Sequence, residues 1–139
     1  MSNVIIIGTG PAGISAAQYT RRANIETTLI GNGIGALEKA EKIENYYGFA
    51  EPISGPELAR RGLENARRLG CTIRMEEVTG LTWDGDFTVS TAAGQYRASA
   101  VILATGAARN TPDLPGVAAF EGRGVSYCAV CDAFFYRQK

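Results

Sequence analysis

The stretch VIIIGTGPAG, residues 4–13, decides the fold of this chain. Its first four residues are apolar and β-branched, which is typical of a buried parallel strand. Gly8, Gly10 and Gly13 have GxGxxG spacing, and the residues after them, ISAAQYTRRA, predict a helix. The stretch IETTLI, residues 25–30, predicts the next strand. Strand, glycine turn, helix and strand within about thirty residues form the context in which this motif binds a dinucleotide.

Each of the three glycines has its own expected role in that turn. Gly8 permits the tight turn, Gly10 lets a pyrophosphate approach the backbone, and Gly13 lets the helix lie close to the strand. Small residues that include Ala12 and Ala17 are expected to form the packed face of the helix. The helix N-terminus offers free N–H groups and a positive dipole end to phosphates. We therefore predict dinucleotide binding, against the alternative of a glycine turn that is only structural.

One expected residue is missing from the motif. An acidic residue about 20 positions after the first glycine normally closes the second strand and binds the ribose hydroxyls. Gly31 and Asn32 stand at that place. The amide of Asn32 can still bond a ribose hydroxyl without charge, so the sequence predicts a weaker ribose contact and an intact phosphate site.

The middle of the chain predicts a helix followed by strands. The helix begins at Ser54 or Gly55 and ends at Gly70, with its arginines on a solvated face. Short strands separated by turn signals over 71–98 predict an inserted β-meander, and the apolar run SAVILATGA predicts a further buried strand. The fold class is therefore α/β, a Rossmann-like domain with a parallel sheet and an inserted β-meander. The predicted domains are residues 1–111 and 112–139.

Composition excludes several classes of function. The chain has 139 residues with 14 basic and 14 acidic side chains, which favours neither nucleic acid nor an anionic membrane as a partner. The sequence predicts no membrane span and no secretory signal, so we expect a cytoplasmic protein. Three cysteines are an odd, low count for a disulfide framework.

Two of those cysteines form the CxxC of YCAVCD, residues 127–132. A dithiol in this arrangement typically carries electrons. A zinc site would need four ligands, and the chain has no histidine and one further thiol, Cys71. We therefore predict no metal site, and we expect Cys71 to be a buried, inert residue.

Four motifs in register resemble one family. GTGPAG at the start, ENYYGF at 44–49, ATGA at 104–107 and CAVCD at 128–132 have the order and spacing of the low-molecular-weight thioredoxin reductases. The glutathione reductase group instead carries CxxxxC shortly after the second strand, and residues 31–50 contain no cysteine. The resemblance implies a first domain that binds FAD, a thioredoxin-like protein substrate and a homodimer.

The resemblance also implies roles for individual residues. Cys131 would be the flavin-facing thiol, Cys128 the thiol that attacks the partner disulfide, and Asp132 the proton donor or acceptor for the leaving thiolate. Tyr46 and Tyr47 could cover the flavin ring, or could be core or dimer-surface aromatics. The residues implied at the FAD site are Gly8, Thr9, Gly10, Pro11, Ala12, Gly13, Gly31, Asn32, Asn45, Val78, Ala104, Thr105 and Gly106.

A complete reductase of this family is longer than 139 residues. We therefore expect the chain to be an N-terminal part that does not turn over alone, with residues 126–139 poorly anchored. The electron donor of the whole protein would be NADPH or, as in the ferredoxin-dependent flavin-thioredoxin reductases, ferredoxin. The alternative is an isolated dinucleotide-binding domain without redox activity.

Overall fold

The computed structural model describes residues 2–107, 110–129 and 133–137. The chain divides into two compact units, residues 1–106 and 107–139, which are described separately. Cys131 and Asp132 lie outside the described residues.

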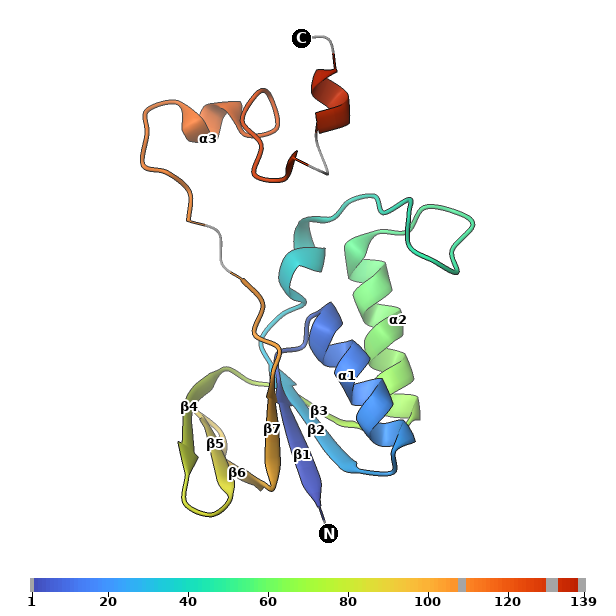
Figure 1. Cartoon of the computed structure of the whole chain (residues 1–139), viewed down its shortest axis with the longest axis vertical. Coiled ribbons are helices and arrows are strands. Elements are labelled where there is room, and N and C mark those ends of the chain that lie inside the picture. The colour runs from blue at the N-terminus through green and yellow to red at the C-terminus, as the bar shows by residue number, and fades with distance from the viewer. Residues whose placement is uncertain (1, 108–109, 130–132, 138–139) are drawn as a thin grey trace. The chain divides into compact units, whose positions relative to one another are not determined.

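A parallel sheet forms the centre of the first unit (Figure 1). Its described strands are β1 (Asn3–Ile7), β2 (Glu26–Gly31), β3 (Thr72–Met75) and β7 (Ala100–Leu103), in the order β3-β2-β1-β7. All three pairings are parallel. The strands predicted at residues 4–7 and 25–30 are therefore confirmed as β1 and β2, and the α/β class is confirmed with them. The carboxyl ends of β2, β1 and β7 meet at one edge, where a doubly wound sheet places its ligands.

The strand β3 corrects one detail of the sequence reading. Residues 71–78 were expected to open the β-meander, yet Thr72–Met75 pairs in parallel with β2, from Thr28↔Thr72 to Gly31↔Met75. Local pattern identifies a strand but not its partner, because pairing depends on where the preceding helix returns the chain. The antiparallel meander therefore begins at the next strand, β4 (Val78–Trp83).

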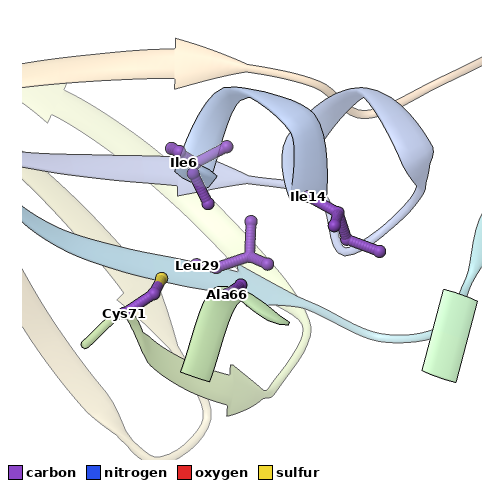
Figure 2. Close-up of a cluster of buried hydrophobic side chains, with 6 residues drawn as sticks. Ile6, Ile14, Leu29, Ala66 and Cys71 are labelled. Carbon is purple, nitrogen blue, oxygen red and sulfur yellow. The ribbon is translucent and has the colours of Figure 1, made fainter. Parts of the chain in front are cut away.

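Two helices cover one face of the parallel sheet (Figure 1). They are α1 (Pro11–Arg22) and α2 (Gly55–Arg68). Figure 2 shows the cluster between them and the sheet, which contains Ile6, Ile14, Leu29, Ala66 and Cys71. Burial of these apolar side chains fixes the helices on the sheet, at roughly 25 cal/mol per Å² of surface removed from water.

An antiparallel sheet covers the opposite face. Its strands are β4 (Val78–Trp83), β5 (Phe87–Thr91) and β6 (Gly94–Ala98), in that order. Val89 and Ala98 from this sheet pack against Ile5, Ile7 and Ile30 of the parallel sheet. Alternate residues of β1 thus face the helices and the meander, as a central strand with two covered faces requires.

The caps of α2 follow the sequence signals. Ser54 is the N-cap, and its hydroxyl accepts a hydrogen bond from the backbone N–H of Glu57 at 3.3 Å. Gly70, with φ +87°, follows the helix and turns the chain toward β3. The predicted ends of this helix are confirmed. A short 3₁₀ helix, η1 (Gly35–Lys39), connects β2 to the segment before α2.

The second unit contains α3 (Val117–Phe120) and η2 (Ala133–Tyr136). A β-bridge between Glu121 and Val125 closes a short turn after α3. Among the residues that the structure describes in either unit, no helix is both long and apolar enough to cross a membrane.

Candidate functional site

The turn between β1 and α1 is built from the GxGxxG motif. Gly8 has φ +121° and donates its N–H to the carbonyl of Ile30 at 2.7 Å. A Cβ on Gly8 would collide with the carbonyl of Ala104, at the end of β7. Gly8 therefore lets three strand ends approach one another, which a residue with a side chain would prevent.

The glycine turn and the start of α1, residues 8–13, could hold an anion, and we call this turn the cradle. The N-cap residue is Gly10, whose backbone is extended. No described side chain accepts a hydrogen bond from the N–H groups at this helix start, and Pro11 is the first residue of the helix. The first turn contains no acidic residue, so its free N–H groups and the helix dipole offer an uncompensated positive end. A Cβ on Gly10 would find its nearest neighbour, the carbonyl oxygen of Ile34, 3.6 Å away. A methyl group at Gly10 would therefore make ordinary van der Waals contact without a clash, so the packing of the protein does not itself require a glycine there.

Gly13 has the opposite environment. A Cβ there would collide with the carbonyl oxygen of Gly8 and lie 3.2 Å from the side chain of Leu29. The helix consequently approaches the sheet as closely as the motif predicts. Ala12 corrects the expected packed face, because it is exposed while Gly13, Ile14 and Ala17 are buried. An exposed Ala12 belongs to the rim of the cradle.

The end of β2 lies directly against this turn. A Cβ on Gly31 would lie 2.7 Å from both the backbone nitrogen and the hydroxyl oxygen of Thr9. Thr9 is 1% exposed, and its hydroxyl donates to the carbonyl of Gly33 at 2.5 Å. Asn32, between these anchors, is exposed. Sequence reasoning missed the Thr9 bond, whose only signal is a hydroxyl inside the glycine motif.

The strand ladder brings together most of the predicted cofactor residues of the first unit. The N–H of Ala104 donates to the carbonyl of Ile7 at 2.8 Å, which extends β7 to the glycine turn. Thr105 and Gly106 follow and are exposed, and Gly106 has φ +74° with no atom within 4 Å of its would-be Cβ. The residues that these contacts place at the carboxyl edge are Gly8, Thr9, Gly10, Pro11, Ala12, Gly13, Gly31, Asn32, Ala104, Thr105 and Gly106.

Val78 and Asn45 lie in other elements. Val78 is the first residue of β4 and is half-buried beside the cluster between the two sheets. Asn45 is exposed in the segment 44–52, whose ends are joined by two backbone hydrogen bonds between Ile43 and Ile53, at 2.8 and 3.0 Å. No contact of Asn45 connects it to the glycine turn in the structure as described.

The tyrosines of the same segment are surface residues. Tyr47 is 98% exposed and Tyr46 is 53% exposed, which excludes a core role for either in this unit. The ring of Tyr46 lies 6.0 Å from the ring of Phe49, and the guanidinium of Arg61 lies 5.6 Å from the Phe49 ring centroid. These contacts hold the segment against α2.

The cysteines fall into two groups. Cys71 is buried, and burial raises the pKa of its thiol, so it lacks the thiolate character of a reactive cysteine. Cys128 belongs to the second unit, is half-buried, and donates its N–H to the hydroxyl of Ser126 at 3.1 Å. The predicted partners Cys131 and Asp132 lie outside the described residues. Within the described ranges, no cluster of His, Cys, Asp or Glu could hold a metal ion.

Comparison with known proteins finds similarity to oxidoreductases. Residues 2–139 match the family model described as pyridine nucleotide-disulphide oxidoreductase. The thioredoxin reductase of Treponema pallidum is 46% identical over 140 residues, which cover 99% of this chain and 46% of that protein. The thioredoxin reductase of Bacillus subtilis is 44% identical over 99% of this chain and 44% of its own length.

A solved structure agrees with these sequences. The atypical thioredoxin reductase TRi from Desulfovibrio vulgaris Hildenborough superposes with a TM-score of 0.72 at 46% identity, covering 98% of this chain and 46% of that one. The chain thus spans less than half the length of the relatives that it matches.

Proposed function

The chain belongs to the pyridine nucleotide-disulphide oxidoreductase family, and from this premise we propose that it is the FAD-holding, dithiol-carrying part of a thioredoxin reductase. Two curated relatives with that name support the proposal. Because the chain spans less than half of each, the activity is proposed for a whole reductase and not for these 139 residues alone. NADPH and ferredoxin stay alternative electron donors, and the homodimer and the cytoplasmic location stay predictions.

The environment of Gly10 is the observation that carries the proposal. Gly8, Gly13 and Gly31 are each needed by the fold, because a Cβ at any of them would meet protein atoms closer than side chains tolerate. At Gly10 a Cβ meets nothing nearer than 3.6 Å, beside the uncapped start of α1. A glycine that the fold does not need, at the end of a helix that offers free N–H groups, fits a bound pyrophosphate.

The other residues that the resemblance implies at the FAD site would each contact one part of the dinucleotide. Amides at the start of α1 would bond the phosphates, Asn32 would bond the ribose, and the backbone at Val78 would meet the adenine. Asn45, Thr105 and Gly106 would lie toward the flavin ring. FAD, when bound, would supply a two-electron carrier for the dithiol.

The proposed chemistry of the dithiol is thiol–disulfide exchange. The thiolate of Cys128 attacks a disulfide of a thioredoxin-like protein, which forms a mixed disulfide and releases one substrate thiolate. Cys131 then attacks the sulfur of Cys128, so that the second substrate thiolate leaves and a Cys128–Cys131 disulfide forms. Two electrons pass to the substrate, and Asp132 would carry the proton that the leaving thiolate takes up.

An FAD titration tests the proposal, and Gly10→Ala is the decisive variant. The added methyl group fits the protein but occupies the space of the pyrophosphate, so we expect an unchanged urea midpoint and at least tenfold weaker binding of FAD, followed by flavin fluorescence. Gly80→Ala is the matched control, because its Cβ also meets its nearest atom at 3.6 Å, on Ser90 in the antiparallel sheet. Equal FAD affinity in wild type, Gly10→Ala and Gly80→Ala would contradict the proposed site, and absence of binding to the wild type would favour a domain without FAD.

A further inference from the structure

Glu76 joins the carboxyl edge of the parallel sheet to the antiparallel sheet. It directly follows β3, and its backbone N–H donates to the carbonyl of Gly31 at 3.1 Å. Gly31 in turn packs against Thr9 of the glycine turn. The backbone of Glu76 therefore lies one hydrogen bond away from the wall of the cradle, two residues before Val78.

The carboxylate of Glu76 has hydrogen-bond partners on two strands of the antiparallel sheet. It accepts hydrogen bonds from the hydroxyl of Thr91 on β5 at 2.7 Å and from the hydroxyl of Tyr96 on β6 at 2.9 and 3.1 Å. The guanidinium of Arg74 on β3 lies 3.6 Å from one carboxylate oxygen and 4.6 Å from the centroid of the Tyr96 ring. The Glu76 side chain is 19% exposed and that of Arg74 is 42% exposed, so the carboxylate is more shielded from water than its guanidinium partner.

A second polar link joins the same two sheets at the opposite end. Asn3, the first residue of β1, donates to the carbonyl of Arg97 at 2.8 Å and accepts from the backbone N–H of Ser99 at 3.1 Å. The antiparallel sheet is thus tied near the amino end of β1 by Asn3 and near the carboxyl end of β2 by Glu76. Only the Glu76 link borders the edge where the glycine turn lies.

We propose that Glu76 is a positioning residue for the nucleotide site, which holds the segment 76–78 at the rim of the cradle through Tyr96 and Thr91. The inference rests on the proposed function, because the site that it positions is the FAD site. A carboxylate that accepts two hydroxyl donors and faces a guanidinium forms stronger hydrogen bonds than a neutral amide does. Its ionised form therefore keeps the rim in one place, and loss of the charge lets the rim move.

The Glu76→Gln variant of the 139-residue chain tests this role, with FAD as the ligand. A charge-assisted hydrogen bond is roughly twice as strong as a neutral one. We therefore expect the variant to bind FAD about fivefold more weakly. Tyr96→Phe removes one of the two hydroxyl donors and should also weaken binding. The double variant should lose less affinity than the product of the two single losses, because both substitutions act on the same hydrogen bond between Tyr96 and residue 76.

Asn3→Ala separates positioning from stability. It removes the link at the far end, so it should lower the urea midpoint and leave the FAD affinity of the folded chain unchanged. If the wild type binds FAD, the proposed function stands. The inference is then overturned if Glu76→Gln and Tyr96→Phe leave the FAD affinity unchanged, or if Asn3→Ala lowers it equally. If the wild type binds no FAD, the proposed function fails and this inference falls with it.

Discussion

Gly10 and Gly13 belong to one motif, yet the structure gives them separate tasks. Gly10 is not required by the packing of the protein, whereas Gly13 is required by the packing of α1 on the sheet. The motif predicts different roles for them, the approach of a pyrophosphate at Gly10 and close packing of helix on strand at Gly13. The contacts of a would-be Cβ distinguish them, and so do the experiments that follow.

Gly13→Ala is expected to destabilise the fold. Its methyl group would collide with the carbonyl of Gly8, a backbone atom that cannot move without disturbing the turn. Overpacking of this kind costs about 1–3 kcal/mol, and a backbone neighbour favours the upper end. Urea unfolding followed by circular dichroism measures the loss. A variant as stable as the wild type would mean that α1 lies farther from β1 than the structure places it.

Asn32→Glu restores the acidic residue that the motif lacks. Asn32 is exposed beyond the last residue of β2, so a longer side chain meets no steric obstacle from a packed core. One added charged hydrogen bond to a ribose hydroxyl should leave FAD binding unchanged or strengthen it by about 1 kcal/mol. Isothermal titration calorimetry checks this, and a large loss of affinity would show that the ribose does not lie at the end of β2.

At the scale of elements, the start of α2 is stabilised by charge. Arg60 and Arg61 both donate to the carboxylate of Glu57 at 2.7 Å, and these hydrogen bonds lower the pKa of Glu57 from 4.5 to about 2. A lowered pKa in the folded state means that the contribution is complete above about pH 4.5 and is lost as the pH falls toward 2.

The pH dependence of Glu57→Gln follows from that sign. The difference in urea midpoint between wild type and variant should be greatest at neutral pH and should disappear as the pH approaches 2. The matched control is the same substitution in an Arg60→Gln, Arg61→Gln background, where the pH-dependent part should be absent. If the difference in urea midpoint between wild type and variant stays constant from neutral pH to about pH 2, the two arginines do not cause it. Because the groups are exposed, high salt should weaken the effect.

The elements show what local sequence can and cannot predict. The strands at 3–7 and 26–31 and both ends of α2 follow from apolar runs, Ser54 and Gly70, all of which act locally. The pairing of β3 with β2 was missed, because a strand pattern carries no information about its partner. The network of Glu76 with Tyr96 was missed for the same reason, since it joins residues that are 20 positions apart.

At the scale of the whole molecule, the chain combines one site that the structure describes with one that it describes in part. The cradle of the first unit is built by contacts among β1, β2, β7 and α1. The dithiol belongs to the second unit, where Cys128 is described and Cys131 and Asp132 are not. The roles of the dithiol were predicted from resemblance alone and stay predictions. The glycine turn, in contrast, was predicted from residue spacing, and its geometry agrees with that spacing.

An NMR titration of the ¹⁵N-labelled chain with FAD tests the central claim most directly, because it locates the ligand residue by residue. The account predicts that amide shifts concentrate at residues 8–13, 31–35, 76–78 and 104–106, which the contacts of the glycine turn and of Glu76 bring to one edge of the sheet. The turn at Asp84–Gly85, between β4 and β5, should stay unchanged. Shifts that concentrate at that turn or along the exposed face of α2, with residues 8–13 unaffected, would contradict a nucleotide site at the glycine turn.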